Sequence, residues 1–160
     1  MNKIIAYTDG SSNWKNGLGG YGVYMKVFYN DHLEQELYFH EGFSNTKTGR
    51  MELRAIITCL QKINDKSVQI TIYSDSQYAI KCVTERRLWR WERSLWDGIK
   101  NVDLLKQYLH EVRQFRTIPK LIHIKGHQEN IDNDHIYGNN MADLLADYKQ
   151  FKEYKEDIRL

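Results

Sequence analysis

The stretch GRMELRAIITCL, residues 49–60, separates two parts of the sequence that have different patterns. On a helix at about 100° per residue, Glu52 shares a face with Ile56 and Cys59, while the polar side chains gather on the opposite face. A carboxylate therefore points toward the expected core. An ionised carboxylate is costly to bury without partners, so such groups are paired, protonated or bound to a metal. The position of Glu52 predicts such a partner.

The segments on both sides of this helix predict an α/β domain. Three strands precede it, the last two joined as a hairpin, and strands alternate with helices after it. This order indicates a mixed sheet covered by helices. The expected strands are 3–8, 21–29, 34–43, 68–74 and 120–125, and the expected helices are the one containing 49–60, two pieces within 76–99, 101–115, and a last helix from about Asn139.

Length and composition fit one domain, because 160 residues with 41% hydrophobic content can bury a core. The sequence has no internal repeat, no low-complexity tract and no apolar run long enough to span a membrane. The N-terminal residues lack the layout of a signal peptide, so we expect a cytoplasmic protein. Cys59 and Cys82 are too few for a zinc site or a secreted disulfide scaffold, and we expect buried, reduced thiols.

The net charge of +2 is unremarkable, but basic residues are concentrated in the segment 81–99. Tryptophans are interleaved with them, among them Trp89 and Trp91. Cations that bind phosphates, mixed with aromatics that stack on bases, are typical of a nucleic-acid surface. An ordinary amphipathic helix is the alternative, because Leu88, Trp91 and Leu95 recur at helical spacing.

Acidic residues stand at positions where a ligand site is expected. Asp9 and Asp75 each follow an apolar strand at its carboxyl end, which is the edge where open α/β sheets bind ligands. Asp143 lies in the first turn of the last helix, with Asp147 as a competing candidate. Singly, these residues are explained as a turn residue, an N-cap and a helix-dipole partner. Together with Glu52 they would repel unless divalent cations such as Mg²⁺ or Mn²⁺ neutralise them.

Six motifs in order carry a family resemblance: YTDGS with GGYG, GRMEL, SDSQY, KNVDL, KGH and NNMADLLA. On these motifs the sequence resembles the type 1 ribonucleases H over nearly its whole length. The resemblance implies the ribonuclease H-like fold, a five-stranded mixed sheet flanked by helices. It also implies a metal-dependent endoribonuclease that hydrolyses the RNA strand of RNA–DNA hybrids with two Mg²⁺ ions, or Mn²⁺ in their place. The products implied are 5′-phosphate and 3′-hydroxyl ends.

Matched residue by residue, the motifs imply the catalytic carboxylates Asp9, Glu52, Asp75 and Asp143. Asp9 is expected to bridge the two ions, and the other three to complete their shells. Glu52 also lies where the family contacts the RNA 2′-hydroxyl, the group that distinguishes RNA from DNA.

The KGH motif implies a catalytic role for His127 in proton transfer or product release. His123 and His135 are the alternatives, and the chain between His127 and Asp143 is longer than the family pattern. The glycine-rich turn also departs from that pattern, with Trp14 in place of an Asn-Pro-Gly-like sequence. The resemblance implies contacts to the hybrid from Asn45, Thr46, Lys47, Thr48, Gln77, Arg86, Arg87, Trp89 and Arg90.

The expected organisation is one ribonuclease H catalytic domain over residues 1–160, with no N-terminal hybrid-binding module. The basic segment 81–99 would then grip the nucleic acid, and a monomer is expected. Two other functions remain open from the sequence: a non-catalytic nucleic-acid-binding module, and a structure-specific DNA nuclease of the same fold.

Overall fold

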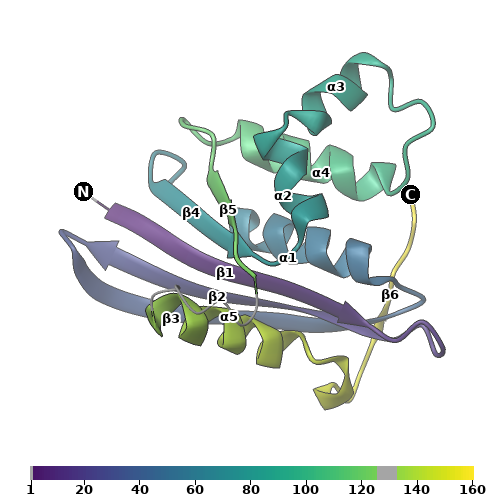
Figure 1. Cartoon of the computed structure of the whole chain (residues 1–160), viewed down its shortest axis with the longest axis horizontal. Coiled ribbons are helices and arrows are strands. Elements are labelled where there is room, and N and C mark those ends of the chain that lie inside the picture. Colours follow the sequence, from purple (N-terminus) through teal and green to yellow (C-terminus); the bar gives the residue numbers. More distant parts are fainter. Residues whose placement is uncertain (1, 126–132) are drawn as a thin grey trace.

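The computed structural model describes residues 2–125 and 133–160. Helices and strands alternate after an N-terminal set of three strands (Figure 1). Their bounds are β1 Asn2–Ser12, β2 Gly19–Tyr29, β3 His32–Ser44, α1 Thr48–Gln61, β4 Gln69–Ser74, α2 Gln77–Thr84, α3 Arg87–Arg93, α4 Val102–Arg113, β5 Lys120–His123, α5 Asn133–Ala146, the 3₁₀ helix η1 Tyr148–Gln150, and β6 Lys155–Glu156.

Six strands in the described residues form one sheet in the order β5-β4-β1-β2-β3-β6. Strands β1, β2 and β3 are antiparallel neighbours, whereas β4 runs parallel to β1 and β5 runs parallel to β4. The β2–β3 turn consists of Asn30 and Asp31, both in the left-handed region that tight hairpin turns require. The predicted five-stranded mixed sheet is confirmed, with the two-residue strand β6 added beside β3.

Helices α1, α2 and α4 lie on one face of the sheet, and α5 crosses the other face (Figure 1). On the first face, apolar side chains of α1 such as Ile56 and Leu60 are fully buried against the sheet and α4. Cys59 and Cys82 are buried, free thiols within this core, as predicted. Among the residues described, no helix combines the length and apolar character needed to cross a membrane.

The α5 face of the sheet carries a row of tyrosines, one from each of four adjacent strands. Tyr73, Tyr7, Tyr24 and Tyr38 are stacked in that order, with successive ring centroids 5.3, 5.9 and 5.2 Å apart. Gly138 lets α5 sit directly on this row, because a Cβ atom there would come within 2.4 Å of the Tyr7 ring. The row therefore fixes the height of α5 above the sheet.

Two parts of the chain differ from the prediction. Helix α5 is already formed at Asn133, earlier than the predicted start near Asn139, because its first turns pack on the tyrosine row. The residues after α5 form η1 and β6, which the sequence pattern did not indicate.

Candidate active site

The parallel pairing of β1 and β4 brings two predicted acidic residues together. Thr8 of β1 is in register with Ser74 of β4, so Asp9 and Asp75 are the next residues on neighbouring strands. Asp9 is buried, while Asp75 is exposed at the end of β4. The carboxyl edge of the sheet therefore carries a buried and an exposed carboxylate side by side.

Two glycines beside Asp9 allow helices to approach it from both faces of the sheet. A Cβ atom on Gly10 would come within 2.4 Å of the backbone nitrogen of Glu52 in α1. Gly22 pairs with Asp9 across the strands, and a Cβ atom on it would come within 2.5 Å of the Ala142 carbonyl oxygen in α5. Glycine at these positions lets α1 and α5 place their acidic residues at the strand ends.

Glu52 reaches the site from α1 and is half-buried. Its Oε2 atom accepts a hydrogen bond of 2.6 Å from the Ser76 hydroxyl, which also caps α2 by accepting from the Ala79 amide at 3.1 Å. Burial raises the pKa of Glu52, the charge of Asp75 raises it further, and the Ser76 hydrogen bond opposes both. Within the described residues, the hydrogen-bond partner of Glu52 is the Ser76 hydroxyl. Ser76 itself was not predicted, although it stands in the SDSQY motif.

Asp9 lies at the electrostatic centre of the site. Burial raises the pKa of Asp9 to about 9, and a hydrogen bond with Asp143 together with the negative charges of Asp75 and Asp143 acts in the same direction. Burial and the charge of Asp143 also raise the pKa of Asp75. The structure thus brings Asp9, Asp75 and Asp143 together, with Glu52 next to Asp75.

The chemistry of these donors fits a hard divalent cation. Burial and the neighbouring acidic groups raise these pKa values, with the charge of His123 partly opposing the shift at Asp75, and carboxylate oxygens are the ligands that Mg²⁺ and Mn²⁺ prefer. Within the described residues, no group of three or more His, Cys, Asp or Glu side chains is placed so that it could hold a metal ion. Mg²⁺ is usually bound by one or two carboxylates together with water and substrate phosphates, so a site for it does not require such a group.

Asp147, the competing candidate, is exposed and caps η1 by accepting from the Lys149 amide at 3.0 Å. Its hydrogen bond is therefore a local one that caps η1.

The three candidate histidines have different surroundings. His127 lies outside the described residues. The Nε2 atom of His123 lies 3.2 Å from the backbone oxygen of Asp75, next to the acidic cluster. His135 lies in α5, where its Nδ1 atom is 2.7 Å from the Tyr7 hydroxyl and its ring packs on Tyr73. His135 is thus part of the aromatic packing under α5.

The predicted contact segment 45–48 joins β3 to α1 at the same end of the sheet. The side chains of Asn45, Lys47 and Thr48 are exposed, and the Thr48 hydroxyl lies 2.7 Å from that of Ser12. Thr46 is buried, and its hydroxyl donates to Asp157 instead of facing outward. Gln77 is exposed at the start of α2.

The basic segment forms α3 and its flanking turns, with Leu88 buried and the cations largely exposed. The Arg86 guanidinium lies 4.6 Å from the centre of the Trp89 ring, and Arg87 pairs with Glu85 at 3.1 Å. Arg90 is exposed. The segment therefore contains packing residues and exposed cations, which are the two alternatives that the sequence left open.

The fold and the acidic cluster together define an α/β domain with carboxylates gathered at the carboxyl edge of its sheet. A family model described as RNase H matches residues 1–150. Ribonuclease HI of Helicobacter pylori is 36% identical, with 84% of this chain and 87% of the relative covered. Ribonuclease H of Lachnoclostridium phytofermentans is 33% identical, with 82% and 85% covered. The chain belongs to the RNase H family, and the resemblance to its type 1 members is confirmed.

Solved structures show the same fold. The RNase H domain of PFV superposes with a TM-score of 0.74 at 22% identity, covering 91% of this chain and 92% of that domain. LC9-RNase H1, described as a type 1 RNase H with the type 2 active-site motif, has a TM-score of 0.70 at 22% identity and covers 89% of this chain and 69% of that one.

Proposed function

We propose that this chain is an endoribonuclease that hydrolyses the RNA strand of RNA–DNA hybrids. Membership of the RNase H family supports this activity, since relatives named Ribonuclease H match most of the chain. The observation that carries the proposal is the convergence of Asp9, Asp75 and Asp143 at the carboxyl edge of the sheet, where burial and then the neighbouring acidic groups raise the pKa of Asp9. Such a cluster has a clear chemical use when divalent cations and a polyanionic substrate occupy it.

Divalent metal dependence is general for the family, and we assign Mg²⁺ as the metal, with Mn²⁺ as an alternative. The residues that would hold two ions are Asp9, Glu52, Asp75 and Asp143. When bound, the ions neutralise charge at the scissile phosphate and activate the attacking water. Burial and the neighbouring acidic groups raise the pKa of Asp9 to about 9, so metal binding at this site would be coupled to the release of a proton.

Hydrolysis adds a water oxygen to phosphorus and breaks the bond between phosphorus and the 3′ oxygen. The products are a 5′-phosphate and a 3′-hydroxyl. The chain itself holds the four acidic groups in place: Asp9 on β1, Glu52 on α1, Asp143 on α5 and Asp75 directly after β4. His127 is proposed to move a proton during this step or to assist product release, as the motif implies.

The substrate-binding surface is proposed to extend from the acidic cluster over the exposed parts of 45–48 to α3. Exposed cations such as Lys47 and Arg90 suit the phosphates of a duplex, and Trp89 adds an aromatic surface. Asn45, Thr48, Gln77, Arg86 and Arg87 belong to the same proposal. Thr46 supports it only through its backbone, because its hydroxyl donates to Asp157.

The finer organisation is also part of the proposal. We propose one catalytic domain over residues 1–160 that acts as a monomer in the cytoplasm. The free, buried thiols of Cys59 and Cys82 suit a reducing compartment. The family resemblance supports the monomer.

The test is a gel assay with one end-labelled RNA strand presented as hybrid, as RNA duplex or as single strand. Each substrate is incubated with Mg²⁺, with Mn²⁺ or with EDTA. We expect metal-dependent cleavage of the hybrid, and no cleavage of the RNA duplex or the single strand. Tight hybrid binding without cleavage would favour a non-catalytic binding module. An end-labelled, matched DNA duplex is incubated in parallel, and its cleavage would favour a DNA nuclease.

A further inference from the structure

The C-terminal tail, residues 155–160, returns to the active-site end of the sheet. Strand β6 pairs with β3 beside Phe43 and Ser44, and the Asp157 amide then donates to the Ser44 carbonyl at 2.9 Å. Figure 1 shows the tail passing the end of α1 on its way to the C-terminus. The tail lies beyond residues 1–150, which the family model matches. The contacts that the tail makes within this chain therefore indicate its structural role.

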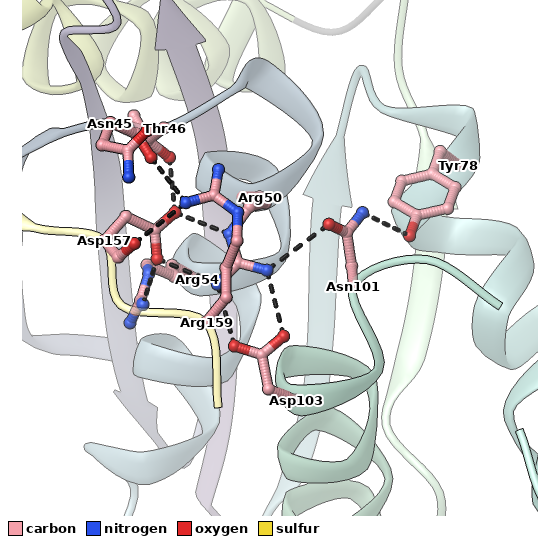
Figure 2. Close-up of polar contacts among 9 residues, drawn as sticks. All are labelled: Asn45, Thr46, Arg50, Arg54, Tyr78, Asn101, Asp103, Asp157 and Arg159. Atoms are coloured by element: carbon pink, nitrogen blue, oxygen red, sulfur yellow. Dashed lines mark hydrogen bonds and ion pairs between the residues drawn. The ribbon is translucent and has the colours of Figure 1, made fainter.

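Asp157 is the anchor of this tail. Its side chain has no exposed surface, and its carboxylate accepts hydrogen bonds from Arg50 at 2.6 and 2.9 Å, from Arg54 at 2.6 Å and from the Thr46 hydroxyl at 2.7 Å (Figure 2). These donors hold the pKa of the Asp157 carboxyl well below its usual range despite its burial. A carboxylate with this many donors is fixed in place.

Arg50 ties the tail to a second helix. Its guanidinium donates to both oxygens of Asp103, at 3.0 and 2.9 Å, on the side opposite Asp157. Asn101 accepts a further bond of 3.4 Å and donates to the Tyr78 hydroxyl (Figure 2). Arg50 is only 2% exposed, so this cation depends on both carboxylates. The start of α1 is thereby locked between the tail and α4.

The tail also holds the backbone of the contact segment 45–48. The Asn45 carbonyl accepts from Arg159 at 2.7 Å, and the same guanidinium nitrogen lies 3.0 Å from the Asp157 carbonyl. Asn45 has a φ of +53°, a left-handed conformation that needs local support. The Thr46 amide donates to Gly17 at 3.0 Å. The segment is held from the inside by the tail, while Lys47 stays exposed on the outside.

The same region forms a groove with a basic lining. Lys47, Lys100 and Arg159 contribute to its wall, and the acidic group there, Asp103, is already engaged by Arg50. The groove adjoins the segment 45–48, so the tail shapes a surface that suits a polyanion.

We propose that Asp157 and Arg159 are positioning residues for nucleic-acid binding. Through Thr46, Arg50 and the Asn45 carbonyl they hold the segment 45–48 in the conformation that presents Lys47 to a phosphate backbone. The inference rests on the proposed function, because it assigns a role within that substrate site. Ordering the segment before binding removes an entropic cost from association, so loss of the tail contacts weakens substrate binding rather than the chemical step.

The main test compares Arg159→Ala with Lys155→Ala. Both remove one exposed cation from the same tail, but Lys155 pairs with Glu41 at 2.6 Å and does not contact the segment 45–48. Steady-state cleavage of a labelled hybrid gives KM and kcat, and fluorescence anisotropy in EDTA gives hybrid binding without cleavage. We expect Arg159→Ala to raise KM and the dissociation constant about threefold to tenfold, the effect of one lost hydrogen bond. Its kcat should stay within about twofold of wild type.

Two further variants separate positioning from charge and from folding. Arg159→Gln keeps a donor for the Asn45 carbonyl without the positive charge, and should restore most of the binding lost in Arg159→Ala. Asp157→Asn should weaken binding more than Arg159→Ala does, with its thermal midpoint measured in parallel. If Asp157→Asn does not fold, the comparison of Arg159→Ala with Lys155→Ala still decides.

Equal losses in Arg159→Ala and Lys155→Ala, or unchanged binding in a folded Arg159→Ala, would overturn the inference. Failure of the proposed function is separate from both, because it appears as a wild-type chain that does not cut hybrids at all.

Discussion

Asp9, on the central strand β1, and Asp143, on the helix α5 that crosses one face of the sheet, lie close enough for their carboxyl groups to interact. Two carboxyl groups this close interact favourably only when one of them holds a proton. Burial and the nearby charge of Asp75 supply the reason why Asp9 keeps that proton. In the metal-free protein, Asp9, Asp75 and Asp143 therefore repel one another when ionised, at the point where cations are expected to bind.

Asp9→Asn should abolish cleavage and largely spare hybrid binding. The substitution removes a proposed metal ligand but leaves the exposed cations that face phosphates. Loss of several kcal/mol of transition-state stabilisation corresponds to a rate at least about 10³-fold lower. Single-turnover cleavage in Mg²⁺ and anisotropy in EDTA measure the two properties. Asp147→Asn is the control, since Asp147 is an exposed acid outside the acidic cluster and asparagine can also cap η1. Wild-type turnover in Asp9→Asn would sink the site assignment.

Asp9→Asn should also stabilise the metal-free protein. The folded pKa of Asp9 lies above the model-compound value of 3.8, so its contribution to stability is present at low pH and is lost as the pH rises through the folded pKa of about 9. Asparagine removes this penalty. We expect a thermal midpoint a few degrees higher in EDTA, since about 1 kcal/mol corresponds to roughly 2–4 °C in a chain of this size.

The midpoint of the wild type in EDTA should fall between pH 5 and pH 9 more steeply than that of Asp9→Asn. Added Mg²⁺ should raise the wild-type midpoint and have a smaller effect on the variant. Identical pH profiles of the thermal midpoint in the two proteins would show that ionisation of Asp9 does not destabilise the metal-free protein.

Much of the fold could be predicted because its signals are local. The apolar runs before Asp9 and Asp75 and the helical pattern around Glu52 are visible within short windows of sequence. The structure extends β1 past Asp9 to Ser12 and shows the parallel pairing of β1 with β4, on which the meeting of the two acids depends. The convergence at Asp9 also depends on Gly10 and Gly22, whose role becomes clear only when the helices that contact them are known.

The C-terminal tail could not be predicted in the same way. The sequence KEDIRL has neither helical nor strand periodicity, and β6 is two residues long. Burial of Asp157 depends on Arg50, a residue distant in the sequence, whose charge would ordinarily indicate the surface. For the same reason Thr46 was predicted to contact substrate, whereas its hydroxyl faces Asp157.

Arg90→Ala should weaken hybrid binding, and it should make that binding less dependent on salt concentration. Arg90 is an exposed cation of α3, so we expect the slope of log KM against log salt concentration to fall by about 1 if it contacts one phosphate. Arg113→Ala is the matched control on the neighbouring helix, because Glu92 already neutralises Arg113 through two hydrogen bonds. Equal salt slopes in wild type and Arg90→Ala would remove Arg90 from the binding surface.

Gly138→Ala should destabilise the protein, although alanine normally favours a helix by about 1 kcal/mol over glycine. The new methyl group would come within 2.4 Å of the Tyr7 ring, which is buried and stacked between Tyr73 and Tyr24. Overpacking of this kind costs about 1–3 kcal/mol, and α5 must shift to relieve it.

Because α5 also carries Asp143, the rate of hybrid cleavage by Gly138→Ala should fall together with its stability. Asn140→Ala changes an exposed position of the same helix and should lower neither quantity. Urea unfolding and initial cleavage rates test both variants, and a Gly138→Ala protein more stable than wild type would contradict the packing described here.

The ion network around Arg50 should make stability sensitive to acid. Arg50 holds the pKa values of Asp103 and Asp157 below the usual 3.8, so their contribution to stability is complete above about pH 4 and is lost as the pH falls further. Asp157→Asn should lower the free energy of unfolding at pH 7 by about 3–5 kcal/mol, because it leaves buried Arg50 with one carboxylate fewer. It should also flatten the acid limb below pH 4. Urea unfolding at pH 7, 5 and 3 measures both effects, with Asp31→Asn as control for an exposed pair with Lys3. An Asp157→Asn curve that runs parallel to wild type down to pH 3 would mean that this carboxylate does not set the acid limb.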